Sequence, residues 1–110
     1  MLTSLLEARA DFTALFASND TVAMGVMAAL RAQGLRIPED VAIVGYDDIL
    51  PAACAAPPLT TIRSPALEHG RLAGETLIQL IQGQHIGPPP DLAIDLVVRA
   101  SCGAAGKRLR

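Results

Sequence analysis

Two pairs of polar residues follow the two strongest strand-like runs of the sequence and are the first candidates for chemistry. Asn19-Asp20 follows the apolar run 12–17, and Asp47-Asp48 follows the β-branched run 41–46. An amide both donates and accepts hydrogen bonds, and a carboxylate accepts bonds from hydroxyl groups. Because open α/β sheets bind ligands at the carboxyl ends of their parallel strands, these residues predict a site for a small polyhydroxylated molecule.

Structural roles compete with ligand binding at these positions. Asp20 stands where a helix should begin, so we expect it to be the N-cap of that helix. Asp48 can cap the short segment that follows it, or accept a hydrogen bond within its own turn. Asn19 and Asp47 come directly after the strands and are therefore the better candidates for ligand contacts.

No catalytic constellation accompanies these residues. Asp47 and Asp48 are neighbours at a strand end, so their side chains should diverge rather than share a proton. The sequence contains neither a Gly-x-Ser-x-Gly elbow nor a phosphate-binding glycine-rich loop. His69 and His85 are isolated, and the two cysteines lack the spacing of a metal site. We therefore predict that the chain is no enzyme and has no catalytic residue, no metal and no cofactor.

The pattern of apolar residues predicts alternating strands and helices. A strand, a helix and a second strand within residues 12–46 form a βαβ unit, whose crossover is right-handed. We expect an α/β fold with a parallel sheet. The expected strands are 12–17, 41–46, 59–63 and 92–99, the expected helices are 1–9, 21–33 and 66–82, and segment 49–56 is short helical or irregular.

The helix expected at 21–33 is apolar nearly all round. We expect one side to face the sheet, formed by Val22, Val26, Ala29 and Leu30, and the other side to carry Ala23, Met24, Met27 and Ala28. A helix that is apolar on two sides is buried on both, so its second side should contact a second subunit. Likewise, the continuous apolar run 41–46 is typical of a parallel strand that is covered on both faces.

Composition narrows the class of protein. Among 110 residues, 51% are hydrophobic and 18% are charged, which indicates a chain that forms a core. The net charge is −2 and the basic residues cluster only at 107–110, so the chain lacks the basic face that a DNA duplex requires. No apolar stretch suits a membrane span or a signal peptide. We expect a cytoplasmic protein with reduced thiols and no membrane partner.

Five segments, in order, resemble transcription regulators of the LacI/GalR family. Segment 16–25 is similar to that family's F-A-x-N-D-x-x-A-x-G, and segment 34–48 resembles its G-L-x-[IV]-P-x-D-[IV]-x-[IV]-[IV]-G-[YF]-D-D. Segment 57–62 resembles P-x-L-T-T-[IV], segment 70–73 matches the helix after it, and segment 97–101 resembles the ending L-[IV]-x-R-x-S. The resemblance covers nearly the whole chain.

This resemblance implies a partial periplasmic-binding-protein-like fold, which is Rossmann-like, with three layers and a parallel sheet. In such a fold two subdomains close around a small effector, commonly a sugar or a related metabolite. Residues 1–64 correspond to the βαβ part of the C-terminal subdomain, and 91–100 to its final strand. Residues 65–90 correspond to a crossover helix and loop that pack in the N-terminal subdomain, and 101–110 to a tail.

The resemblance also implies residue roles. Asn19 and Asp47 match effector contacts, and Ser64 takes a ligand-facing position where many relatives carry an aromatic or an amide. A homodimer interface is implied on the helix from 21 and the segment 49–54, involving Met24, Met27, Ala28, Ile49, Ala53 and Cys54. Operator DNA would be bound only through an N-terminal helix-turn-helix domain, which has no counterpart in these 110 residues.

Alternatives stay open at this point. The apolar stripe of the helix 66–82 can find another partner, stay exposed or fold back. For function, we expect the effector-binding and dimerisation segment of a LacI/GalR-type regulator. The alternatives are a sugar-binding protein of a transport system, an enzyme that uses Asp47 and Asp48, and a remnant without independent activity.

Overall fold

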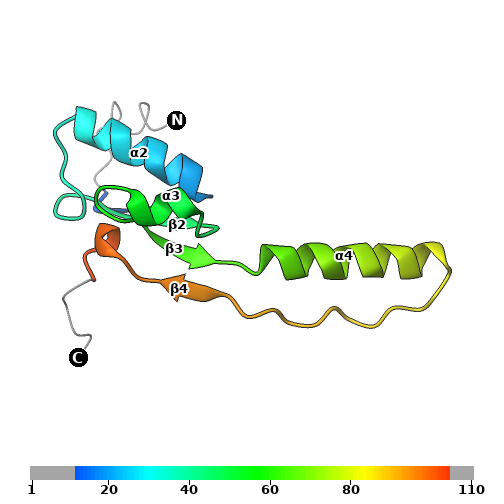
Figure 1. Cartoon of the computed structure of the whole chain (residues 1–110). Coiled ribbons are helices and arrows are strands. Elements are labelled where there is room, and N and C mark those ends of the chain that lie inside the picture. The colour runs from blue at the N-terminus through cyan, green and yellow to red at the C-terminus, as the bar shows by residue number, and fades with distance from the viewer. Residues whose placement is uncertain (1–11, 105–110) are drawn as a thin grey trace.

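A four-stranded sheet organises the computed structural model, which describes residues 12–104 (Figure 1). The strands are β1 (Ala14–Phe16), β2 (Ala42–Tyr46), β3 (Thr60–Arg63) and β4 (Asp95–Val97), in the order β1-β2-β3-β4. The first three strands are parallel, and β4 pairs with β3 in the antiparallel direction. The sheet is therefore mostly parallel, as expected, although β4 is much shorter than the segment 92–99.

The helices follow the predicted pattern closely. They are α2 (Asp20–Ala32), α3 (Leu50–Cys54) and α4 (Ala66–Ile81), with a 3-10 turn η1 (Ala100–Cys102) after the last strand. Helix α2 ends before Gly34, whose φ of 76° is the left-handed conformation that glycine adopts without strain. The helix expected at 1–9 lies outside the described residues.

The orientation of α2 corrects the sequence prediction. Leu30 is buried as expected, but Ala23 and Met27, expected on the opposite side, are buried with it, whereas Val22, expected to face the sheet, is 42% exposed. The reason lies at the start of the helix: Asp20 is fully buried, and a buried first residue brings positions 23, 27 and 30 onto the same face. The buried face of α2 thus includes a polar residue, which the apolar content of the sequence did not indicate.

The core lies between α2, α3 and one face of the sheet (Figure 1). Strand β2 alternates between half-buried and buried residues, so within residues 12–104 one of its faces is fully covered and the other only partly. Ile43 and Gly45 belong to the buried set. Ala42, Val44 and Tyr46 are half-buried, because the described helices α2 and α3 cover only one side. The second helical layer of a three-layer fold is not among the described residues.

Helix α4 projects away from this core as an arm, and the segment after it runs back along the helix to β4 (Figure 1). The described chain extends 57 × 35 × 25 Å and has a radius of gyration of 18.1 Å, against about 13 Å for a compact domain of this size. No residue of α4 is buried, and Leu67 and Ile81 are 91% and 77% exposed. Of the three alternatives for this apolar stripe, the structure shows the exposed one.

Gly45 permits a close contact between α2 and the sheet. A Cβ at this position would overlap Oδ1 of Asp20 and lie 3.1 Å from Cδ2 of Leu59. Glycine in a strand interior often marks such an approach. The absence of a side chain at position 45 therefore allows Asp20 to lie against β2.

We predict that Gly45→Ala lowers the free energy of unfolding by about 1–3 kcal/mol, because the added methyl group overpacks a site with no space. Urea denaturation followed by far-UV circular dichroism measures the change. Gly25→Ala is the matched control: nothing lies within 4 Å of its Cβ position in α2, so we expect a gain of about 0.5–1 kcal/mol. An equal response of the two variants would contradict the packing argument.

Candidate functional site

The polar residues predicted as ligand contacts follow the carboxyl ends of three adjacent parallel strands. In the register of the sheet, Phe16 of β1 lies beside Val44 of β2, and Tyr46 of β2 lies beside Ile62 of β3. The three strands therefore end toward the same edge of the sheet. Asn19, Asp47 and Ser64, which the sequence proposed as ligand residues, follow those ends in order.

Asn19 is the N-cap of α2, which corrects the expectation for Asp20. Its Oδ1 accepts a hydrogen bond of 2.8 Å from the backbone N–H of Val22. The side-chain NH2 of Asn19 makes no hydrogen bond within residues 12–104. Asn19 can therefore cap the helix with its oxygen and still offer its two N–H donors to a ligand.

Asp20 is the first residue of α2 and has a structural position. Its buried carboxylate accepts a hydrogen bond of 2.5 Å from the Thr61 hydroxyl and one of 3.0 Å from the backbone N–H of Ile49. These bonds join α2 to β3 and to the start of α3. Full burial leaves Asp20 no surface to offer a ligand.

At the carboxyl edge of the sheet, Asp47 has a carboxylate without a hydrogen-bond partner among residues 12–104. The residue is exposed, and its backbone N–H donates a 2.9 Å hydrogen bond to the carbonyl of Ile62. The Asp47 carboxylate makes no hydrogen bond to any residue in 12–104. Asp47 and Asp48 have φ values of 109° and 54°, a region that aspartate enters more readily than most residues. These two consecutive residues turn the chain sharply at the end of β2.

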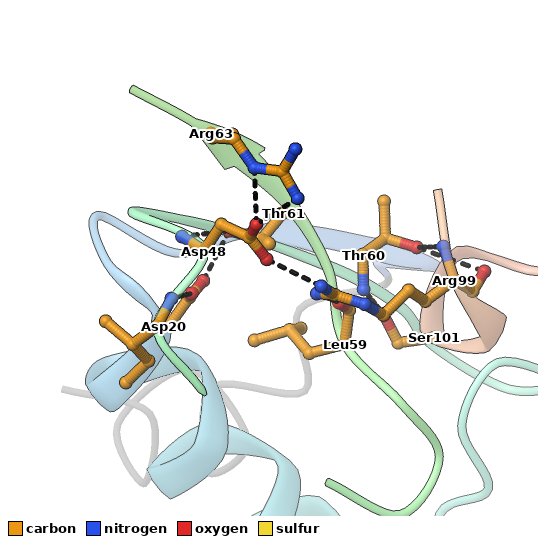
Figure 2. A network of polar contacts seen from close by, with 9 residues as sticks. Asp20, Asp48, Leu59, Thr60, Thr61, Arg63, Arg99 and Ser101 are labelled. Carbon is orange, nitrogen blue, oxygen red and sulfur yellow. Dashed lines mark hydrogen bonds and ion pairs between the residues drawn. The ribbon is translucent and has the colours of Figure 1, made fainter. Parts of the chain in front are cut away.

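Asp48 forms ion pairs instead of the cap or local turn contact that the sequence suggested (Figure 2). Its carboxylate accepts hydrogen bonds from Nε of Arg63 at 2.7 Å and from Nη2 of Arg99 at 2.6 Å. Its backbone N–H also lies 3.4 Å from the Thr61 hydroxyl. The Arg99 guanidinium, with help from Arg63 and against the effect of burial, holds the pKa of the Asp48 carboxyl below its ordinary value.

A second set of contacts attaches the end of β4 to the sheet (Figure 2). The Arg99 N–H donates to Oγ1 of Thr60 at 2.8 Å, and the Ser101 hydroxyl donates to the carbonyl of Ile43 at 2.6 Å. Ser101 also accepts from the N–H of Thr60 at 2.8 Å. Arg99 and Ser101 belong to the segment 97–101 that resembles the family's ending, but their roles could not be predicted from the sequence, since only the fold brings them to β2 and β3.

Ser64 is half-buried between the end of β3 and α4. Its hydroxyl lies 3.4 Å from Nδ1 of His69, an exposed residue in the first turn of α4. Ser64 thus places one hydroxyl group at this edge, where the chain passes from the core to the arm.

The residues predicted for a dimer interface lie on α2 and α3, except Ile49, which directly precedes α3 and is half-buried against the core. Ala28, Ala53 and Cys54 are exposed and Met24 is half-buried, but Met27 is only 2% exposed and packs in the core. A shallow hollow of about 180 Å³ lies beside them, lined by Met24, Met27, Arg31, Ala55 and Ala56. Leu50, at the start of α3, is 83% exposed. This surface is therefore mainly apolar.

The described residues 12–104 contain no group of three His, Cys, Asp or Glu side chains suited to a metal ion. None of the helices in this part of the chain combines the length and the apolar character needed to cross a membrane.

Residues 2–102 match the family described as periplasmic binding protein-like domain. The chain is also 51% identical over 79 residues to the ribose operon repressor of Haemophilus influenzae, an alignment that covers 72% of this chain and 24% of the repressor. The chain thus spans about a quarter of the length of that relative.

Solved structures agree with the sequence matches. The regulator CelR in complex with cellobiose superposes with a TM-score of 0.78 at 39% identity, covering 91% of this chain and 31% of CelR. The lac repressor dimer bound to operator and the anti-inducer ONPF superposes with a TM-score of 0.77 at 36% identity, covering 91% and 35% of the two chains.

The parallel strands, their polar carboxyl edge and these matches define the class: the chain belongs to the periplasmic binding protein-like domains. Within that class it corresponds to part of the effector-binding domain of the LacI-family transcriptional regulators. The matched relatives are transcription regulators, which confirms the expectation that the chain is not an enzyme.

We predict that Asp48→Asn lowers the free energy of unfolding at pH 7 by about 1.5–3 kcal/mol, the range for hydrogen bonds to charged groups. The pKa of Asp48 is lowered in the folded state, so its stabilising contribution is complete above the ordinary pKa of aspartate. That contribution disappears as the pH falls through the lowered value. The difference between wild type and variant should therefore narrow in acid.

Urea denaturation of both proteins between pH 7 and pH 3 measures this difference. Asp91→Asn is the control, since Asp91 is exposed and makes no ion pair within residues 12–104. A difference that stays constant down to pH 3 would argue against the ion pairs as its source.

Proposed function

We propose that this chain is the effector-binding and dimerisation segment of a LacI-type regulator, and that its ligand is a sugar or a related polyhydroxylated metabolite. The observation that carries the proposal is the exposed Asp47 carboxylate, which has no hydrogen-bond partner in residues 12–104 and follows the central strand of the parallel set. The carboxyl edge of such strands is where ligands of open α/β sheets bind.

The three residues at this edge supply complementary groups. Asp47 accepts hydrogen bonds from ligand hydroxyls, and these bonds are charge-assisted and therefore strong. The Asn19 NH2 group donates, while its oxygen remains occupied by the helix cap. The Ser64 hydroxyl can do both. This combination suits a neutral ligand with several hydroxyl groups better than an anion, which the Asp47 charge would repel.

The apolar surface of α2 and α3 is proposed as the dimer interface. Support comes from the exposed Leu50, Ala53 and Cys54, which lie next to the hollow lined by Met24. Met27 contributes from beneath, because its side chain is buried in the chain itself and lines the hollow from the core. The solved lac repressor in the comparison is a dimer, which supports dimerisation of a related chain.

Regulation would follow from linkage between two sites. A ligand that binds one arrangement of the subdomains better than another shifts the protein toward that arrangement. We propose that operator DNA is contacted through a separate helix-turn-helix domain of a regulator that includes this segment, and that the regulator acts in the cytoplasm.

We predict that Asp47→Ala weakens binding of the effector sugar by at least about tenfold, because one or more charge-assisted hydrogen bonds are lost. Titration of the isotope-labelled chain with ribose, glucose and cellobiose, followed by amide chemical shifts, detects even weak binding. The shifts should centre on residues 19, 47 and 64.

Asp91→Ala removes a carboxylate of the same kind from an exposed position in the segment between α4 and β4 and should leave the affinity unchanged. Saturable shifts that persist in Asp47→Ala, or that map away from the carboxyl edge, would refute the assignment of the site.

We predict that Ala53→Glu weakens dimerisation by at least about tenfold, since it places an unpaired charge in an apolar interface. Sedimentation velocity over a range of concentrations gives the dissociation constants. Ala93→Glu adds the same charge at an exposed position on the returning segment and should have little effect. Equal weakening by both substitutions would place the interface elsewhere.

A further inference from the structure

The Asp48 carboxylate binds both connections between the core and the projecting arm. The chain leaves the core after β3, whose last residue is Arg63, and returns through β4, which Arg99 closely follows. Each arginine donates to a different oxygen of Asp48, Arg63 to Oδ2 and Arg99 to Oδ1 (Figure 2). One side chain at the end of β2 thus holds the outgoing and the returning strand together.

Few other contacts fix the arm to the core. Helix α4 has no buried residue, so its direction depends on the two connections. These are joined by the short antiparallel ladder from Thr61–Val97 to Arg63–Asp95, which is open to solvent at its outer end because Arg63, Asp95 and Leu96 are exposed. A two-stranded ribbon of this length bends easily unless its base is fixed.

We propose that Asp48 is a positioning residue that sets the direction of the arm 64–94 relative to the carboxyl edge of the sheet. The two ion pairs fix the base of the ribbon from both strands. The two arginine side chains are held to the core to different degrees. The Arg99 side chain is 18% exposed and also donates to the carbonyl of Leu59 at 2.7 Å, whereas the Arg63 side chain is 57% exposed. Arg63 is the partner that solvent can more readily replace.

The two ion pairs of Asp48, with Arg63 and with Arg99, form a clamp at the base of the arm. This clamp lies next to the proposed ligand contact Asp47. Both aspartates have positive φ values and belong to the same turn, so a ligand on Asp47 would act on the residue covalently joined to Asp48. In this respect the inference rests on the proposed function, because it gives effector binding a route to the arm. The direction of the arm in the free chain does not depend on any effector.

Distance measurement by pulsed electron paramagnetic resonance tests the clamp. Spin labels are attached at Gln33→Cys on the core and Gln79→Cys on α4, both exposed positions, with Cys54 and Cys102 replaced by serine. An excess of unlabelled chain suppresses distances between two molecules. No effector is added, so the result stands apart from the success or failure of the ligand site.

We expect one narrow distance distribution for the chain with Asp48, and a broader or shifted distribution for Asp48→Asn and for Arg63→Gln. Asp40→Asn is the matched control: Asp40 accepts a bidentate pair from Arg36 at 2.7 and 2.8 Å, but that pair does not touch the arm. It should leave the distribution unchanged.

An ion pair that only stabilises the fold would lower the unfolding midpoint without changing the distances in the folded protein. Unchanged distributions in Asp48→Asn and Arg63→Gln would therefore overturn the proposal, as would equal broadening in Asp40→Asn. If Asp48→Asn does not fold, Arg63→Gln decides alone, since the mostly exposed Arg63 can be replaced with less risk to the fold.

Discussion

The arrangement of the core depends on the hydrogen bonds that the buried Asp20 carboxylate accepts. This carboxylate joins three elements, because it belongs to α2 and accepts hydrogen bonds from Thr61 of β3 and from the N–H of Ile49 before α3. A buried carboxylate is costly unless it is hydrogen-bonded, so the native packing must keep these donors in place. Gly45 provides the space, and the burial of Asp20 in turn determines which face of α2 packs on the sheet.

The four polar residues at the ends of β1 and β2 divide into structural and ligand-facing members. Asp20 and Asp48 are turned inward and their carboxylates are bonded, whereas the Asp47 carboxylate and the Asn19 NH2 group have no partner within residues 12–104. The inward pair gives the outward pair a rigid base. A binding site needs such support, since its polar groups must be held in position by neighbours that do not themselves contact the ligand.

Helix α4 shows that a helix can be specified locally without a core beneath it. The arginine at position 71 pairs with both Glu68 and Glu75, at the spacings that stabilise an isolated helix. Its exposed leucines and isoleucines resemble the buried face of a typical amphipathic helix. The position of the helix is therefore decided at its N-terminal end, by Pro65 and the β3–β4 ribbon, and its own surface contributes little within the described residues.

The sequence alone predicted the α/β class, the order of the elements from β1 to β4, the family and the polar edge, because apolar periodicity and helix-ending residues such as Gly34 act locally. Tertiary structure decided the rest. Whether Asn19 or Asp20 capped α2 depended on a donor 41 residues away, the Thr61 hydroxyl. The role of Asp48 depended on Arg99, 51 residues along the chain. Partners so distant leave no pattern in the neighbouring residues, so only the packing of the sheet could show which carboxylate was bonded and which was free.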